Sequence, residues 1–144
     1  MLKQLQKQRK NAFSLMELLL VLVILATLTA LVAPKFSGRS KQARITAAKA
    51  DIANIELGID SYEIDTGTLP DSGQGLEALI EEPSDIQNWN GPYLKRGVPK
   101  DPWGNEYIYN KPGKHNENGY DLYSAGPDGK EGTDDDVVNW NQDH

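Results

Sequence analysis

The sequence contains no cysteine among its 144 residues. This absence excludes disulfide bonds, catalysis by a thiol nucleophile and metal sites built from thiolates. Basic residues are also outnumbered, since 15 Lys and Arg stand against 21 Asp and Glu and the formal net charge is −6. An acidic chain of this kind lacks the electrostatic footprint of a nucleic-acid-binding protein. Its length and its 38% hydrophobic content suit one modest domain.

Catalytic motifs are equally scarce in the sequence. The two histidines are His115, in a predicted loop, and His144, the last residue, and we expect both to be surface groups. Neither belongs to a recognisable nucleophile–base pair, and the sequence has no glycine-rich phosphate-binding motif. The sequence therefore favours a structural or binding protein over an enzyme.

One long apolar run contrasts with a polar remainder of the chain. Residues 18–33 carry no charge, and stretches with basic residues but no acids flank them at 1–12 and 35–49. Because both flanks are basic, the positive-inside rule does not assign an orientation. Acidic residues concentrate from residue 115 onward. This layout suggests a short cytoplasmic tip, a membrane segment over 13–34 and an exported acidic domain.

Glu17 distinguishes three interpretations of the N-terminal segment. A basic stretch before an apolar run fits a secretory signal peptide cut after Ala33, and residues 13–33 are long enough for a plain single-span anchor. A carboxylate within a membrane segment costs about 2.5–3.5 kcal/mol and usually has a partner. Glu17 could avoid this cost near the headgroups, but neither a signal peptide nor a plain anchor requires an acid there.

The third interpretation explains the acid. Residues 11–17, with the sequence NAFSLME, resemble the processing site of type IV prepilins and type II secretion pseudopilins. The resemblance implies that prepilin peptidase cuts between Ala12 and Phe13, removes residues 1–12 as a leader and methylates the new amino terminus. That cationic amine can meet the Glu17 carboxylate and offset part of its burial cost, and in the family this glutamate sets the register between subunits. The family normally has Gly before the cut, but Ala is the next smallest side chain, so we still expect cleavage after Ala12.

Helical periodicity resumes after Pro34, which should bend the helix. Apolar residues recur at intervals of three or four over 45–62, namely Ile45, Ala48, Ile52, Ile55, Ile59 and Tyr62. The opposite face carries Lys49, Asp51, Asn54 and Glu56, and Thr66-Gly67 predicts the end of the helix. The stripe should pack on the chain's own domain, whereas residues 13–33 must face lipid or sister helices.

The remaining chain predicts a small antiparallel sheet. Residues 106–110 and 120–124 alternate and are rich in aromatics, so we expect two strands joined by a loop over 111–119, with a third strand over 137–140. A short helix is expected over 74–82, and a rigid turn with a packed Trp103 over 101–105. The predicted fold is α+β: a long N-terminal helix (its domain half over 35–66) packed on a small antiparallel sheet domain (67–144) with a metal-binding loop.

Three further segments resemble the major pseudopilin family of type II secretion: 74–79 (QGLEAL), 91–94 (GPYL) followed by 99–105 (PKDPWGN), and 120–129 (YDLYSAGPDG). The resemblance implies a single-pass protein of the bacterial inner membrane, with residues 35–144 in the periplasm, that assembles into a pseudopilus and helps export folded proteins. Its implied partners are other copies of itself, minor pseudopilins, the inner-membrane secretion platform and prepilin peptidase. The alternatives are a type IV pilin, although many pilins carry a C-terminal disulfide, and an anchored calcium-binding module that does not polymerise.

Acidic residues cluster near the C-terminus, at Asp128, Asp134, Asp135 and Asp136. A solvated loop is the simplest interpretation, but Ca²⁺ takes about six to eight oxygen ligands and would turn their repulsion into attraction. The spacing is not that of an EF-hand. The family resemblance implies a structural calcium site whose ligands are the side chains of Asp128, Asp135 and Asp136 and the backbone carbonyls of Ala125 and Val137. It leaves open whether Asp134 is a ligand, a neighbour of the ligands or merely solvated.

Overall fold

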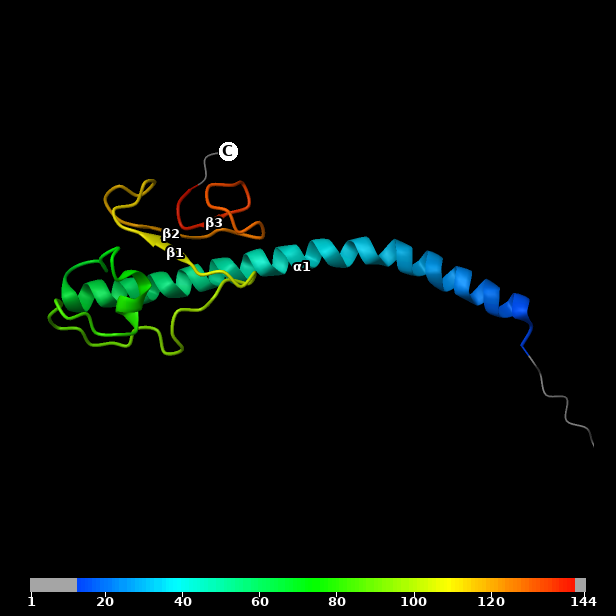
Figure 1. Cartoon of the computed structure of the whole chain (residues 1–144), viewed down its shortest axis with the longest axis horizontal. Helices are drawn as coiled ribbons and strands as arrows, with labels where there is room; N and C mark the ends of the chain where they lie inside the picture. The colour runs from blue at the N-terminus through cyan, green and yellow to red at the C-terminus, as the bar shows by residue number, and fades with distance from the viewer. Residues whose placement is uncertain (1–12, 142–144) are drawn as a thin grey trace, which may run out of the picture. The chain divides into compact units, whose positions relative to one another are not determined.

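The structure is a computed structural model that describes residues 13–141, and of residues 31–37 it describes the backbone alone. Within this part the elements follow in the order α1 (Leu15–Thr66), the 3₁₀ helix η1 (Gly75–Leu79), β1 (Ile108–Asn110), β2 (Asp121–Ser124) and β3 (Val137–Val138) (Figure 1). The chain divides into one compact unit that ends at Ser40 and a second that begins at Lys41. The predicted α+β fold is confirmed.

Helix α1 has defined signals at both ends. The Ser14 hydroxyl accepts a hydrogen bond from the backbone N–H of Met16 at 3.1 Å, so Ser14 caps the first turn. At the other end Gly67 adopts a φ of 77°, and its N–H donates to the carbonyl of Glu63 at 2.8 Å. This left-handed conformation closes a helix at low cost only for glycine. The predicted end at Thr66-Gly67 is therefore confirmed, and the helix continues through Pro34 without a break.

The second half of α1 forms one wall of the hydrophobic core. The predicted apolar stripe is buried, with Ala48, Ile52, Ile55, Ile59 and Tyr62 all 4% exposed or less and Ile45 half-buried beside them. Burying one such isoleucine contributes about 1.5–3 kcal/mol. The prediction that this stripe packs on the chain's own domain is confirmed.

The polar face of α1 is only partly solvated. Lys49 and Asn54 are exposed, as expected. Asp51 and Glu56 instead lie at the edges of the buried stripe, where Asp51 accepts a hydrogen bond from the Tyr107 hydroxyl at 2.9 Å and Glu56 accepts one from the Asn139 amide at 3.1 Å. These two carboxylates attach the sheet region to the helix.

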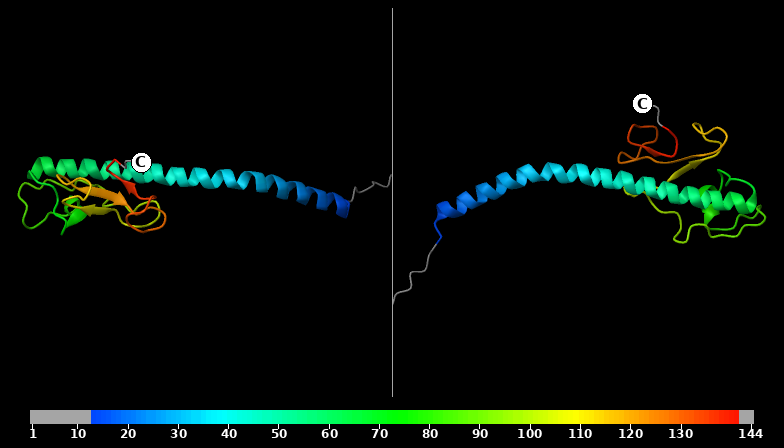
Figure 2. Two further views of the ribbon diagram at one scale, coloured as in Figure 1. Left: turned by 90° about the horizontal axis from the view of Figure 1, so that it is seen from above. Right: turned by 180° about the vertical axis from the view of Figure 1, so that it is seen from behind.

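The sheet has three antiparallel strands in the order β1-β2-β3 (Figure 2). Ile108 pairs with Tyr123 and Ser124 pairs with Val137, and every residue of the central strand β2 is buried. The three predicted strands are confirmed, although each is shorter than expected. The helix predicted over 74–82 is instead the five-residue 3₁₀ helix η1, because a segment this short seldom sustains an α-helix.

Residues 80–107 form no regular strand or helix, and specific polar contacts hold them in place. The Trp89 indole N–H donates to the carbonyl of Ala78 at 2.9 Å. The carboxylate of buried Asp101 accepts the N–H groups of Trp103 and Asn105 at 3.0 and 2.8 Å, and its other oxygen accepts the Ser124 hydroxyl. The predicted turn over 101–105 is present, and Ser124 ties it to β2.

A candidate assembly helix and a candidate calcium loop

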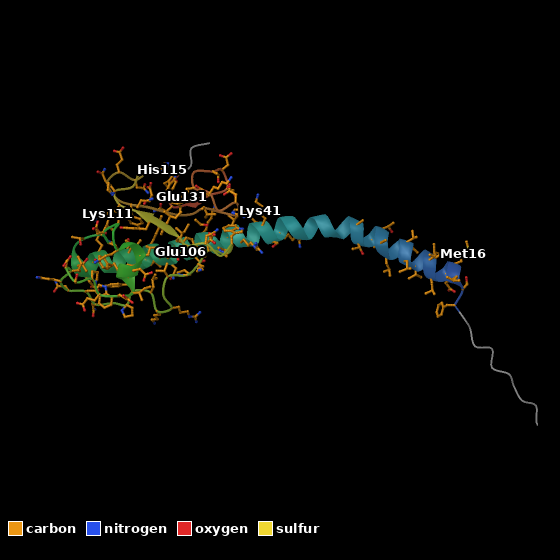
Figure 3. All side chains as sticks on the ribbon, in the orientation of Figure 1. Met16, Lys41, Glu106, Lys111, His115 and Glu131 are labelled. Atoms are coloured by element: carbon orange, nitrogen blue, oxygen red, sulfur yellow. The ribbon has the colours of Figure 1, made fainter. Side chains whose placement is uncertain are left out.

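In the first half of α1, the apolar side chains that the structure describes are exposed on every side. The large hydrophobic residues between Phe13 and Leu28 are 48–81% exposed: Phe13, Leu15, Met16, Leu18, Leu19, Leu20, Val21, Leu22, Val23, Ile24, Leu25 and Leu28. Figure 3 shows such side chains projecting from the helix around Met16. Because consecutive residues point in all directions around a helix, this surface is apolar around its circumference, which indicates contact with lipid or with other proteins.

Glu17 lies in the first turn of this exposed half. Its side chain is exposed, and its backbone N–H donates to the Ser14 carbonyl at 3.1 Å. An acid is favourable in the first turn of a helix because it faces the positive end of the helix dipole. Phe13 and Ser14 directly precede the helix, so the chain that follows the predicted cut starts the helix at once. Ala12, on the other side of the cut, lies outside the described residues.

In the described part of the chain, no helix combines the length and the apolarity that a membrane crossing requires.

The acidic loop connects β2 to β3 and folds back on itself. Gly126 has a φ of 63°, and a Cβ atom placed there would collide with the carbonyl oxygen of Asp135. Only glycine permits this approach. The ends of the loop are adjacent because Ser124 pairs with Val137 in the sheet. Ala125 and Val137, whose carbonyls are predicted ligands, are both 4% exposed.

The loop brings three of the predicted ligands to one point. The Thr133 hydroxyl oxygen lies 2.5 Å from Asp135 Oδ1, 3.3 Å from Asp136 Oδ1 and 3.4 Å from Asp128 Oδ1. A hydroxyl has a single proton and donates to one carboxylate at a time. Three carboxylates therefore share one donor, whereas Asp134 is exposed and takes no part in this cluster.

Further hydrogen bonds fix these carboxylates. The N–H groups of Asp128, Lys130 and Gly132 donate to carboxylate oxygens of Asp135, Asp128 and Asp136, at 3.2, 2.8 and 2.7 Å. The hydrogen bond from Thr133 does most to lower the pKa of Asp135, and the positive charge of Lys41 adds to it. Within residues 13–141, no three acidic or imidazole side chains are arranged to hold a metal ion as they stand. The donor chemistry, carboxylates and carbonyls in one loop, is nevertheless that of calcium sites.

Asp121, a residue that the sequence analysis missed, organises the loop between β1 and β2. It is 2% exposed, and its carboxylate accepts the N–H groups of Lys114, His115 and Asn116 at 2.8, 3.0 and 3.0 Å. Burial alone would raise the pKa of Asp121, but these hydrogen bonds outweigh burial and lower it. The one sequence feature that could have identified Asp121 is its position at the start of a predicted strand, directly after a loop rich in Gly and Asn.

His115 makes more contacts than the surface group that the sequence predicted. Its side chain is 53% exposed, but Nδ1 lies 3.1 Å from the Asp121 carboxylate, and the ring stacks on Trp140 with centroids 4.0 Å apart. Trp140 follows β3, so this stack joins the loop over 111–119 to the chain beyond the acidic loop. The other histidine, His144, lies outside the described residues.

A long N-terminal helix with one exposed apolar half and one half buried under a small antiparallel sheet defines a pilin-like protein. Comparison with known proteins specifies the family. Residues 35–140 match the family described as type II secretion system (T2SS), protein G, and residues 7–33 match the prokaryotic N-terminal methylation motif. The chain belongs to the type II secretion system protein G family.

Individual relatives agree with this assignment. The chain is 44% identical over 142 residues to type II secretion system core protein G of Pseudomonas aeruginosa, covering 94% of this chain and 98% of the relative. It is 42% identical over 136 residues to the Escherichia coli K12 protein of the same name, covering 92% of each. The crystal structure of the major pseudopilin from the type 2 secretion system of enterohaemorrhagic Escherichia coli matches 72% of this chain and 87% of that chain, with a TM-score of 0.65 and 34% identity. The prediction of a pseudopilin, a structural subunit of a pseudopilus, is confirmed.

Proposed function

We propose that this chain is the filament-forming subunit of a type II secretion pseudopilus. Prepilin peptidase cuts it between Ala12 and Phe13 and methylates Phe13. Before assembly, residues 13–34 hold it in the bacterial inner membrane as a single-pass anchor, with residues 35–144 in the periplasm. The observation that carries this proposal is the exposed apolar surface formed by Phe13 and by α1 as far as Leu28. A helix that is apolar on all sides suits lipid before assembly and packing against sister helices afterwards.

Glu17 directs the assembly in this proposal. It is the acid in an otherwise apolar exposed surface, so its carboxylate needs a cationic partner once water is excluded. The methylated amine of Phe13 on a neighbouring copy supplies that cation and fixes the register between subunits. The partners are other copies of the chain, minor pseudopilins, the inner-membrane platform and the peptidase. The role is mechanical rather than catalytic: the filament helps to export folded proteins.

Replacing Glu17 tests this proposal. Because the chain has no cysteine of its own, disulfide crosslinks between copies can be formed from cysteine pairs introduced along the exposed half of α1. We expect a ladder of covalent multimers from cells that carry the complete secretion system. Glu17→Ala should abolish the ladder, whereas Glu77→Ala, at an exposed position of η1, should leave it unchanged. A wild-type chain without a ladder, or the same ladder from Glu17→Ala, would contradict assembly through Glu17 and favour the anchored, non-polymerising module.

We also propose that the loop between β2 and β3 binds calcium. The side chains of Asp128, Asp135 and Asp136 and the carbonyls of Ala125 and Val137 would hold the ion. The support is the convergence of three carboxylates on one Thr133 hydroxyl, a donor that satisfies one of them at a time. A bound calcium ion supplies the positive charge that the three carboxylates share.

Calcium should stabilise the folded state by mass action, by about 2.7 kcal/mol at a free concentration about 100-fold above Kd. Thermal unfolding of the full chain in non-ionic detergent, with calcium or with chelator, measures this gain. Asp128→Ala should remove the calcium-dependent shift of the midpoint, whereas Asp85→Ala, at an exposed position outside the loop, should keep it. An unchanged wild-type midpoint would refute the calcium site.

A further inference from the structure

Helix α1 presents two lysines to the acidic loop. Lys41, Ile45 and Lys49 are four residues apart and therefore share one face of the helix. They line a cavity of about 620 Å³ together with Pro127, residues 134–138, Trp140 and Asn141. Figure 3 labels Lys41 on α1, where the helix enters the folded domain. Basic helix and acidic loop thus face each other across a polar cavity within the unit that begins at Lys41.

The fold fixes this face toward the loop. Ile45, between the two lysines, packs against the core, so the helix cannot turn the lysines away without exposing it. No acid occurs between residues 35 and 49, so the lysines have no carboxylate within that stretch of α1 to neutralise them.

The charge of Lys41 acts across the cavity. Among the described residues, Lys41 forms no ion pair within 4.0 Å. Its side chain nevertheless lines the same cavity as Asp135 and Asp136, so its positive charge faces their carboxylates. Lys41 therefore reduces the repulsion among the loop carboxylates from a distance and leaves space between itself and the loop.

We propose that Lys41 is the internal counter-ion of the acidic loop and competes with calcium for it. This inference rests on the proposed calcium site. A cation near the carboxylates stabilises the calcium-free loop by attraction and opposes an incoming divalent ion by repulsion. Lys41 thereby raises the calcium concentration that is needed to occupy the loop.

Calorimetric titration of calcium into the purified full chain, in non-ionic detergent at low salt, tests the competition. Lys41→Gln should bind calcium about three- to tenfold more tightly than wild type, and raising the salt concentration should reduce this difference. Lys41→Arg keeps the charge and should bind as wild type does. Lys95→Gln makes the same charge change at an exposed position that does not line the cavity, and should also leave the affinity unchanged.

The outcomes separate the two proposals. Equal or weaker binding by Lys41→Gln, in a wild-type chain that does bind calcium, would overturn the role of Lys41 and leave the calcium site in place. Equal tightening in Lys95→Gln would show an effect of net charge and would also overturn it. A wild-type chain that binds no calcium would refute the site and the competition together. Thermal unfolding in chelator gives an independent readout, because Lys41→Gln should then unfold at a lower temperature than wild type.

Discussion

Among the acids of the domain, Asp121 should be one of those whose replacement lowers the free energy of unfolding most. Asp121→Ala tests this. The substitution removes the acceptor of three backbone N–H groups at 2.8–3.0 Å and the partner of the His115 ring. Each lost hydrogen bond costs about 1 kcal/mol, so the free energy of unfolding should fall by about 3 kcal/mol. Asp121→Asn keeps one acceptor oxygen and should cost less. Asp60→Ala, an exposed acid on α1, is the matched control and should stay within about 0.5 kcal/mol of wild type.

The pH dependence of this loss follows from the lowered pKa of Asp121. Because the pKa is lower in the folded state than in the unfolded state, the carboxylate stabilises the fold fully above its unfolded value of about 3.9. That contribution disappears as the pH falls through the lower folded value. Urea unfolding of the full chain in detergent should therefore show the full difference between wild type and Asp121→Ala at neutral pH. The difference should shrink in solution more acidic than about pH 3.9.

Two results would refute this reasoning. A loss below about 1 kcal/mol at neutral pH would mean that water replaces the carboxylate as acceptor. A loss of equal size at neutral and at strongly acidic pH would mean that the ionised carboxylate is not the stabilising species.

Two further predictions concern the acidic loop and the helix–sheet contact. Gly126→Ala should lower the free energy of unfolding by about 1–3 kcal/mol, because it combines a φ of 63° with a Cβ that collides with the Asp135 carbonyl; an unchanged thermal midpoint would contradict this. Tyr107→Phe should cost about 0.5–1.5 kcal/mol through the lost hydrogen bond to Asp51, with no further loss in an Asp51→Ala background; full additivity of the two changes would contradict the bond.

The sequence predicted those parts of the fold that follow from local patterns. The spacing of apolar residues over 45–62 identified the buried face of α1, because a helix places positions three and four apart on one side. Thr66-Gly67 identified its end, and alternation identified the strands. The 3₁₀ form of η1 was not predicted, since apolar spacing over so few residues does not distinguish the two kinds of helix.

Contacts between distant residues could not be predicted in the same way. Asp51 and Glu56 look solvated on a helical projection, but their hydrogen-bond donors, Tyr107 and Asn139, lie 56 and 83 residues further along the chain. The contribution of Asp121 to stability could not be predicted either, because it depends on how the loop before it folds its N–H groups around the carboxylate. In the acidic loop, sequence proximity predicted that the aspartates would gather, but not that Thr133 would lie among them.

The mass of the mature amino terminus tests the central claim most directly. The protein is purified from cells that contain the matching prepilin peptidase and is measured intact and after proteolysis. A pseudopilin should begin at Phe13 and carry one added methyl group on its amine. A chain that begins at Pro34 or Lys35 would contradict this account and indicate a secretory signal peptide, and a chain that retains residues 1–12 in those cells would contradict processing altogether.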